Sequence, residues 1–333
     1  MSSPPSILVG IAIVAAGFCM PSTAVAQQKV EIFPARTLNF PVVSCMGELY
    51  RLRQDQSSVL WGRQIGGGPF KEARGQVSVP AGMILRLCVM YEGGENPAPL
   101  AKLKGNDIQS LDLTRVDFNA NIGKYLANLS QLHELTASDT EAGDTFVHDL
   151  LPLKQLECLT LNRTQISDQG LEDLAKMKSL KILSLSNNDI SDKGIARLGA
   201  LKSLTALHLH KARLTDAGLK ALEGLSEMRY LTLTETKISD AGLASIAKMH
   251  SLINLTIDGT RVRGPGLKSL ADLKHLASII YSSGTVAPHC VTSLKKALPQ
   301  CQMTPAIAGK RSRDAVIDVS KRLKTGQMGT IWP

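Results

Sequence analysis

Apolar and polar positions recur along most of this chain with a period of 24 residues. Four successive segments carry the pattern without insertion, and they begin at Leu156, Leu180, Leu204 and Met228. The same phase continues into four more degenerate segments that begin at Ile108, Leu132, Leu252 and Leu276. A fixed period of this length predicts a solenoid of stacked equal units, whose outer copies act as caps. We therefore expect eight units over residues 108–302.

Each unit opens with L-x-x-L-x-L, in which apolar and polar residues alternate as in a strand with one buried face. In the first complete copy, this alternation predicts that Leu159 and Leu161 point inward. Leu171, Leu174 and Met177 follow at a spacing of three, which predicts a short helix with one apolar stripe. Stacking these units predicts an α/β solenoid with a parallel sheet on the concave face and short helices on the convex face.

A glycine recurs near the start of each expected helix. Because glycine is unfavourable inside helices, this recurrence predicts a close approach of the neighbouring coil at these positions. Ser167 or Asp168, just before the helix of the first complete copy, is expected to cap it. The recurrent glycines are Gly170, Gly194, Gly218 and Gly242.

The copies that read T-x-I-S-D-x-G-L resemble the leucine-rich repeat family, in particular its short bacterial repeats and its cysteine-containing subtype. Residues 294–301, LKKALPQC, also resemble the closing element of bacterial members. Members of this family usually serve as protein-binding scaffolds, so the resemblance implies recognition without naming a ligand. No segment resembles the F-box that precedes such repeats in ubiquitin-ligase receptors.

The residues outside the period suggest three further parts of the chain. Residues 1–26 resemble a secretory signal, because a short apolar run precedes the small residues Ala24, Val25 and Ala26. The absence of Lys and Arg from the first ten residues leaves an uncleaved anchor as an alternative. Short apolar runs between Gly and Pro predict a small β-rich cap over residues 27–107, with a buried strand at Met83–Met90.

Residues 303–333 form a basic tail. It contains six Lys and Arg residues but only two Asp residues, and this positive charge allows contact with an acidic surface such as lipid head groups. The alternative is a solvated, partly disordered end. The whole chain has a formal net charge of +9 over 333 residues. This excess is modest and the chain begins with a signal-like segment, so we expect no nucleic-acid partner and membrane contact only through the tail.

Catalytic and metal-binding motifs are missing from the sequence. It has no nucleophile elbow, no H-E-x-x-H and no phosphate loop, so we expect no enzyme activity and no cofactor. Without a C-x-x-C pair, a structural zinc site is not expected either. The cysteines could form the pairs Cys45–Cys88 and Cys290–Cys301, or act simply as small buried hydrophobic residues.

The strand periodicity also identifies the positions that face outward on the concave sheet. Ser and Thr dominate the middle of this face, and they suit any exposed sheet. Two adjacent units add imidazole, tyrosine and charged side chains that could anchor a partner. His208 and His210 could also approach a metal, but no third ligand is apparent, so we expect none. The predicted binding residues are Ser184, His208, His210, Lys211, Tyr230, Thr232 and Glu235.

Two functions remain open from the sequence. The first is a non-catalytic recognition scaffold that binds a protein or peptide on the concave face, in the periplasm, the cell envelope or outside the cell. The alternative is a structural envelope protein whose repeats pack side by side without a specific soluble ligand.

Overall fold

The computed structural model describes residues 33–53, 63–64, 68–116 and 121–306. The predicted signal at 1–26 and the tail from residue 307 lie outside the described residues. Phe33 begins a single compact unit that contains all the described elements. No helix in this part of the chain is both long and apolar enough to cross a membrane.

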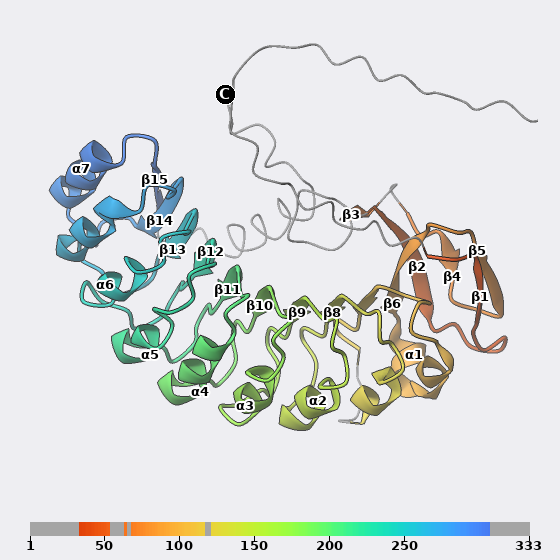
Figure 1. Ribbon diagram of the computed structural model, residues 1–333. Coiled ribbons are helices and arrows are strands. Elements are labelled where there is room, and N and C mark those ends of the chain that lie inside the picture. The colour runs from red at the N-terminus through yellow and green to blue at the C-terminus, as the bar shows by residue number, and fades with distance from the viewer. Residues whose placement is uncertain (1–32, 54–62, 65–67, 117–120, 307–333) are drawn as a thin grey trace, which may run out of the picture. The chain divides into compact units, whose positions relative to one another are not determined.

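Ten neighbouring parallel strands form the main sheet, which confirms the predicted α/β solenoid (Figure 1). Each strand pairs with the strand of the next coil, and equivalent residues of successive units face one another across the pairs. The strands are β6 (Ile84–Val89), β7 (Ser110–Asp112), β8 (Glu134–Thr136), β9 (Cys158–Thr160), β10 (Ile182–Ser184), β11 (Ala206–His208), β12 (Tyr230–Thr232), β13 (Asn254–Ile257), β14 (Ser278–Ser282) and β15 (Gln302–Ala306).

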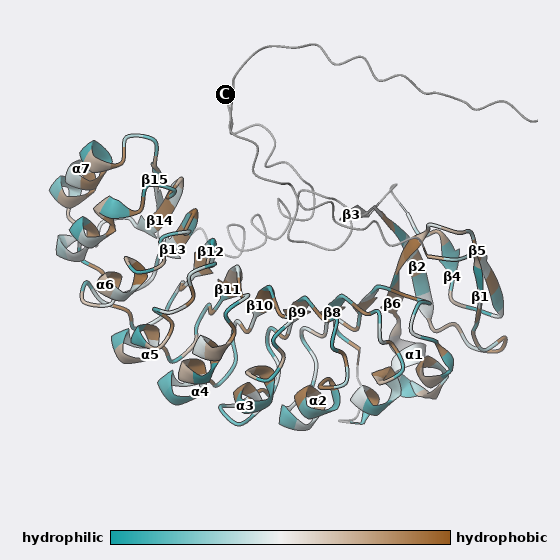
Figure 2. Ribbon diagram, in the orientation of Figure 1, coloured by the Kyte–Doolittle hydropathy of each residue, from teal (hydrophilic) through white to brown (hydrophobic). Residues whose placement is uncertain are grey.

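Short helices line the side of the coils opposite the strands (Figure 1). Their hydrophilic residues lie on the outer side of the helical layer (Figure 2). The α-helices are α1 (Tyr91–Glu95), α2 (Asp144–Asp149), α3 (Gly170–Leu174), α4 (Asp192–Arg197), α5 (Asp216–Lys220), α6 (Leu243–Ile246) and α7 (Pro288–Ala297). The 3-10 helices are η1 (Ala98–Lys102), η2 (Ile122–Leu126), η3 (Leu198–Ala200) and η4 (Pro265–Asp272).

A single leucine core runs through all the coils. Leu159, Leu183, Leu207 and Leu231 face one another in register on β9 to β12, and each is buried. The core cluster extends from the N-terminal strands to Cys301. No unit could bury these leucines alone, so the stack is the structure that removes them from water.

The N-terminal segment adds antiparallel strands to the same sheet. Strand β2 (Gly47–Arg53) pairs with β6, with β3 (Arg63–Gln64) and with β4 (Lys71–Glu72). Strand β1 (Arg36–Asn39) pairs with β5 (Gln76–Val79) in a separate two-stranded sheet. Because β6 also pairs in parallel with β7, the N-terminal strands continue directly into the repeat sheet.

The C-terminal boundary differs from the sequence prediction. We placed the end of the solenoid at residue 302, but β15 pairs in parallel with β14 as far as Ala306. The loss of the leucine pattern after Cys301 concealed this strand. Cys158 and Cys301 are buried, and the other described cysteines are half-buried.

A ladder of aspartates ties neighbouring coils together beside the helices. Asp144 accepts hydrogen bonds from the backbone N–H of Ser167 at 2.9 Å and from its hydroxyl at 2.5 Å. Asp168, Asp192 and Asp216 accept equivalent pairs from Ser191, Thr215 and Ser239. Of the two predicted capping residues, Asp168 instead connects coils, whereas the Ser167 hydroxyl accepts a hydrogen bond from the N–H of Gln169, just before α3, at 3.2 Å.

The same ladder explains the recurrent glycines. A Cβ atom on Gly170 would lie 2.4 Å from Oδ1 of Asp144 in the preceding coil. Gly194, Gly218 and Gly242 meet Asp168, Asp192 and Asp216 in the same way. The close neighbour expected from the sequence is therefore the carboxylate of the preceding coil, which accepts hydrogen bonds from the coil that contains the glycine.

We expect Gly170→Ala to lower the free energy of unfolding by about 1–3 kcal/mol, because the methyl group displaces the Asp144 carboxylate. In an Asp144→Ala background, the same change should be neutral or stabilising, because alanine favours a helix by about 1 kcal/mol over glycine. Urea unfolding of the four proteins in this double-mutant cycle measures the difference. An equal loss in both backgrounds would show that the carboxylate is not the obstacle.

Candidate functional site

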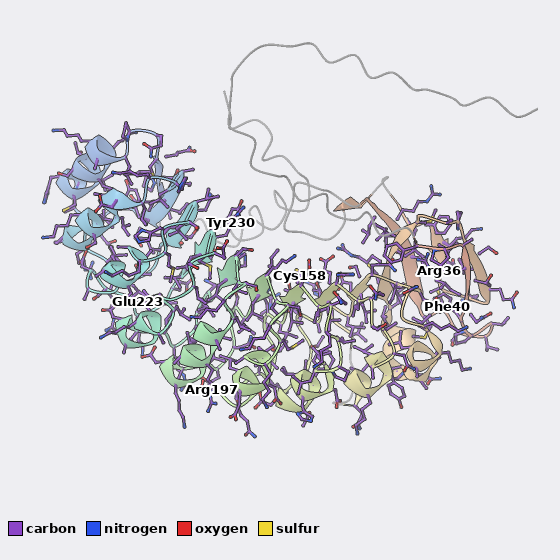
Figure 3. All side chains as sticks on the ribbon, viewed as in Figure 1. Arg36, Phe40, Cys158, Arg197, Glu223 and Tyr230 are labelled. Atoms are coloured by element: carbon purple, nitrogen blue, oxygen red, sulfur yellow. The ribbon has the colours of Figure 1, made fainter. Side chains whose placement is uncertain are left out.

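The outward face of the sheet carries an apolar stripe across β9 to β12. Cys158, Ile182, Ala206 and Tyr230 occupy equivalent positions and pair in register on adjacent strands. They pack together as a cluster separate from the leucine core. Tyr230 is half-buried, and the other three are buried. Figure 3 labels Cys158 and Tyr230 on the strand side of the coils, and Arg197 and Glu223 on the helix side.

The stripe as a unit was not predicted from the sequence, although the signal was present. Only Tyr230 was predicted to bind a partner, on a face whose middle was expected to be mainly hydroxylated. Four apolar residues in consecutive copies of one outward position would have identified the stripe.

A buried ion pair continues the same row towards the N-terminus. Nη2 of Arg86 on β6 lies 2.6 Å from Oε2 of Glu134 on β8, and their side chains are only 13% and 6% exposed. The Ser110 hydroxyl on β7 lies between them, donating to Glu134 and accepting from Nε of Arg86, both at 2.9 Å. Burial, the largest single cause, lowers the pKa of Arg86. The charge and the hydrogen bond of Glu134 together outweigh burial, so the pKa of Arg86 is raised overall.

Three of the predicted site residues form the next row of the sheet. Ser184, His208 and Thr232 pair in register on β10, β11 and β12, and all three are buried. Nδ1 of His208 lies 3.0 Å from Oγ1 of Thr232. The Ser184 hydroxyl donates to Oδ1 of Asn162 at 2.7 Å. These side chains were expected to point outward to a ligand, but their small exposed area suits them to support their neighbours.

Burial also decides the chemistry of the His208–Thr232 pair. It lowers the pKa of His208 from 6.5 to about 4, so the imidazole is neutral at pH 7 and is a weak base. A hydroxyl beside an imidazole can act as an activated nucleophile only when the imidazole accepts its proton readily. The pair therefore stabilises the sheet rather than resembling a catalytic dyad.

The exposed part of the predicted site lies where the strands end. Nζ of Lys211 and Nε2 of His210 lie 3.4 Å and 3.8 Å from the Glu235 carboxylate. About half of the Lys211 and Glu235 side chains is exposed, at 50% and 46%. Burial lowers the pKa of His210, and the Glu235 charge partly opposes this shift. Nδ1 of His210 is buried without a hydrogen-bond partner among the described residues.

Asp258 on the next coil completes this region of the sheet. Its Oδ1 accepts a hydrogen bond from the Thr234 hydroxyl at 2.8 Å, and burial raises its pKa. Within the described ranges, no group of three or more His, Cys, Asp or Glu side chains is placed to hold a metal ion.

Lys211 and Glu235 belong to a longer row, in which each coil places one residue in the left-handed backbone region. We call these residues the αL row. Their charges largely alternate, and ion pairs join Asp139 to Arg115 at 3.8 Å and to Arg163. Such a conformation is unusual for residues other than glycine, so its repetition is a regular feature of the coil. The αL row consists of Arg115, Asp139, Arg163, Asn187, Lys211 and Glu235.

Comparison with known families agrees with this geometry. Two consecutive stretches, residues 176–199 and 200–222, match the family model described as Leucine Rich repeat. These units are leucine-rich repeats. No curated protein matches the chain.

Solved structures with leucine-rich repeat architecture show a distant likeness. An internalin (inlF) from Listeria monocytogenes str. 4b F2365 is 21% identical over 62% of this chain, with a TM-score of 0.47. The alignment spans 63% of that internalin, which is less than two thirds of its length. An internalin C2 (inlC2) from the same strain is 24% identical over 59% of this chain and 80% of its own, with a TM-score of 0.47.

A plant peptide hormone receptor, RGFR1, in complex with RGF2 is 18% identical to this chain. The alignment covers 63% of this chain and 34% of the receptor, with a TM-score of 0.41.

Proposed function

We propose that this protein is a non-catalytic recognition scaffold that binds a protein or peptide ligand on the concave sheet face. The proposal is carried by Tyr230, a half-buried aromatic side chain at the edge of the apolar stripe, on the face of the sheet that the leucine core does not use. Clustered apolar side chains with Tyr at their edge are typical of the central contacts of protein interfaces.

The surroundings of the stripe suit such a ligand. Tyr230 offers an aromatic ring at one end of the stripe, and the αL row offers charged groups at the ends of the same strands. His210, Lys211 and Glu235 lie on the two coils that also carry Ala206 and Tyr230. A ligand could thus combine apolar contact with polar contacts at the rim, the usual division in an interface.

The proposed cellular location rests on the sequence. The signal-like residues 1–26 lead us to propose export, to the periplasm, the cell envelope or the outside of the cell. We also propose that nucleic acid is not a partner and that membrane contact, where it occurs, involves the basic tail.

A photo-crosslinking residue at position 230 tests the proposal in the native exported protein. We expect it to capture a distinct protein or peptide that the same crosslinker at position 248, on the helix side, does not capture. Capture of the same proteins from both positions would contradict recognition on this face. Capture of other copies of this chain alone would favour the structural envelope protein.

Once a ligand is captured, side-chain truncation measures the contribution of the site. We expect His210→Ala together with Tyr230→Ala to raise its Kd about tenfold or more, as for central interface residues. His250→Ala serves as the matched control, because His250 is exposed on the helix side. Equal Kd values for the double variant and the control would exclude this part of the surface.

A further inference from the structure

A second charged row lies two residues after the left-handed position of six successive coils, from the coil of Asp139 to that of Gly259. We call it the lateral row. Every member has an exposed side chain, and the members are 24 residues apart. The lateral row consists of Glu141, Gln165, Asp189, Arg213, Lys237 and Arg261.

Backbone hydrogen bonds fix the spacing of this row. The N–H groups of Gln165, Arg213, Lys237 and Arg261 donate to carbonyls of the preceding coil at 2.8–3.0 Å. Parallel bridges at Gln165, Arg213 and Arg261 hold successive coils together here. The members therefore follow one another at about 4.8 Å, the spacing of paired strands.

The charges of the lateral row are segregated. Its first half holds Glu141 and Asp189, and its second half holds Arg213, Lys237 and Arg261. Asp189 and Arg213 meet at the centre, with Oδ1 and Nε 2.8 Å apart. Among the described residues, Glu141, Lys237 and Arg261 have no ion-pair partner. The ends of the row thus carry opposite charges that the described chain leaves unneutralised.

We propose that two copies of this protein pair through their lateral rows in antiparallel orientation. A twofold axis between the coils of Asp189 and Arg213 would bring Glu141 against Arg261 of the partner subunit. The same axis would bring Gln165 against Lys237 of the partner subunit, and Asp189 against Arg213 of the partner subunit. The lateral rows of the two copies have the same spacing between coils, so all these pairs can form in one register, as an isologous interface requires.

The αL row supports the same axis independently. Under it, Arg163 faces Glu235 of the partner subunit, and Asn187 faces Lys211 of the partner subunit. Asp139 and Arg115 face the neutral positions Gly259 and Ser283 of the partner subunit. No two like charges meet in either row. A row of a single sign would instead place like charges in contact.

The pairing is closed and weak. A twofold contact uses the surface of each copy once, so it stops at a dimer and does not produce open-ended packing. Exposed ion pairs contribute little singly and are screened by salt, so the dimer should depend on ionic strength. The pairing would occupy Lys211 and Glu235 of the αL row, which the proposed ligand site also uses, and would leave Tyr230 outside the contact.

Analytical ultracentrifugation of the full exported chain tests the pairing. We expect a concentration-dependent dimer at low salt that dissociates at high salt. Glu141→Lys and Arg261→Glu should each raise the dimer Kd about tenfold or more, because each creates two like-charge contacts across the axis. Glu227→Lys and Lys248→Glu make the same charge changes at exposed positions outside both rows, in the segments that lead from α5 to β12 and from α6 to β13, and should leave the dimer intact.

A mixture of the two charge-reversed variants provides the sharpest outcome. On one side of the axis, the introduced lysine of one copy then faces the introduced glutamate of the other, and the native pair remains on the opposite side. We therefore expect Glu141→Lys and Arg261→Glu, each monomeric alone, to form a heterodimer when mixed. A wild-type protein that stays monomeric at low salt would overturn the proposal. So would a mixture that stays monomeric, or control variants that weaken the dimer equally.

Discussion

Replacing Glu134 with alanine should lower the free energy of unfolding by about 3–5 kcal/mol, the usual effect of removing one partner of a buried ion pair. The substitution would leave the Arg86 guanidinium in a site where its side chain is only 13% exposed. It would also remove the acceptor of the Ser110 hydroxyl.

Two further variants separate the charge from the packing. Arg86→Met combined with Glu134→Leu should be close to neutral, because no unpaired charge is then left buried. Glu157→Ala breaks the more exposed pair with Lys181 and should lower the free energy of unfolding by about 1 kcal/mol or less. Chemical denaturation measures all three. A loss below about 1 kcal/mol for Glu134→Ala would show that this pair is solvated like a surface pair.

Acid should destabilise the protein through His208. Burial lowers the pKa of His208 from 6.5 to about 4 in the folded state. Between these values the unfolded chain binds a proton that the folded chain does not, so stability falls as the pH falls. Across the interval from pH 6.5 to about 4, the free energy of unfolding falls by about 3 kcal/mol through His208. Above pH 6.5 the imidazole is neutral in both the folded and the unfolded state, so the free energy of unfolding no longer changes with pH through His208.

His208→Gln tests this dependence, because glutamine does not titrate and can still hydrogen-bond Thr232. We expect its unfolding free energy to vary less with pH between 6.5 and about 4 than that of the wild type. A residual slope should remain, since burial also lowers the pKa of His133 to about 4. Identical pH profiles for the variant and the wild type would mean that the pKa of His208 is the same in the folded and the unfolded states.

The repeat period made the solenoid predictable because the same physical requirement recurs in every unit. Leu159 and Leu183 are interchangeable parts of one core, so their spacing defines the coil and the parallel register. The strand β15 was missed because residues 302–306 extend the sheet by backbone pairing rather than by the leucine pattern. The Asp168–Ser191 contact was missed because it joins two coils, whereas local sequence suggested a helix cap.

The candidate site was only partly predictable for a related reason. Periodicity identified which side chains face away from the core, but it could not indicate how far neighbouring strands bury them. His208 and Ser184 are on the predicted face and yet are buried. Lys211 and Glu235 form an ion pair, and both adopt the αL conformation. Neither residue type predicts that conformation. Only the structure shows that the exposed chemistry lies at the strand ends.

Hydroxyl-radical footprinting of the protein with and without its captured ligand tests recognition on the concave face most directly. Tyr230 and His210 report on that face, and His250 and His275 are exposed in the segments that lead to β13 and β14. We expect the ligand to slow oxidation of Tyr230 and His210 and to leave His250 and His275 unchanged. Protection of His250 and His275, with no change at Tyr230 and His210, would contradict recognition on the concave face.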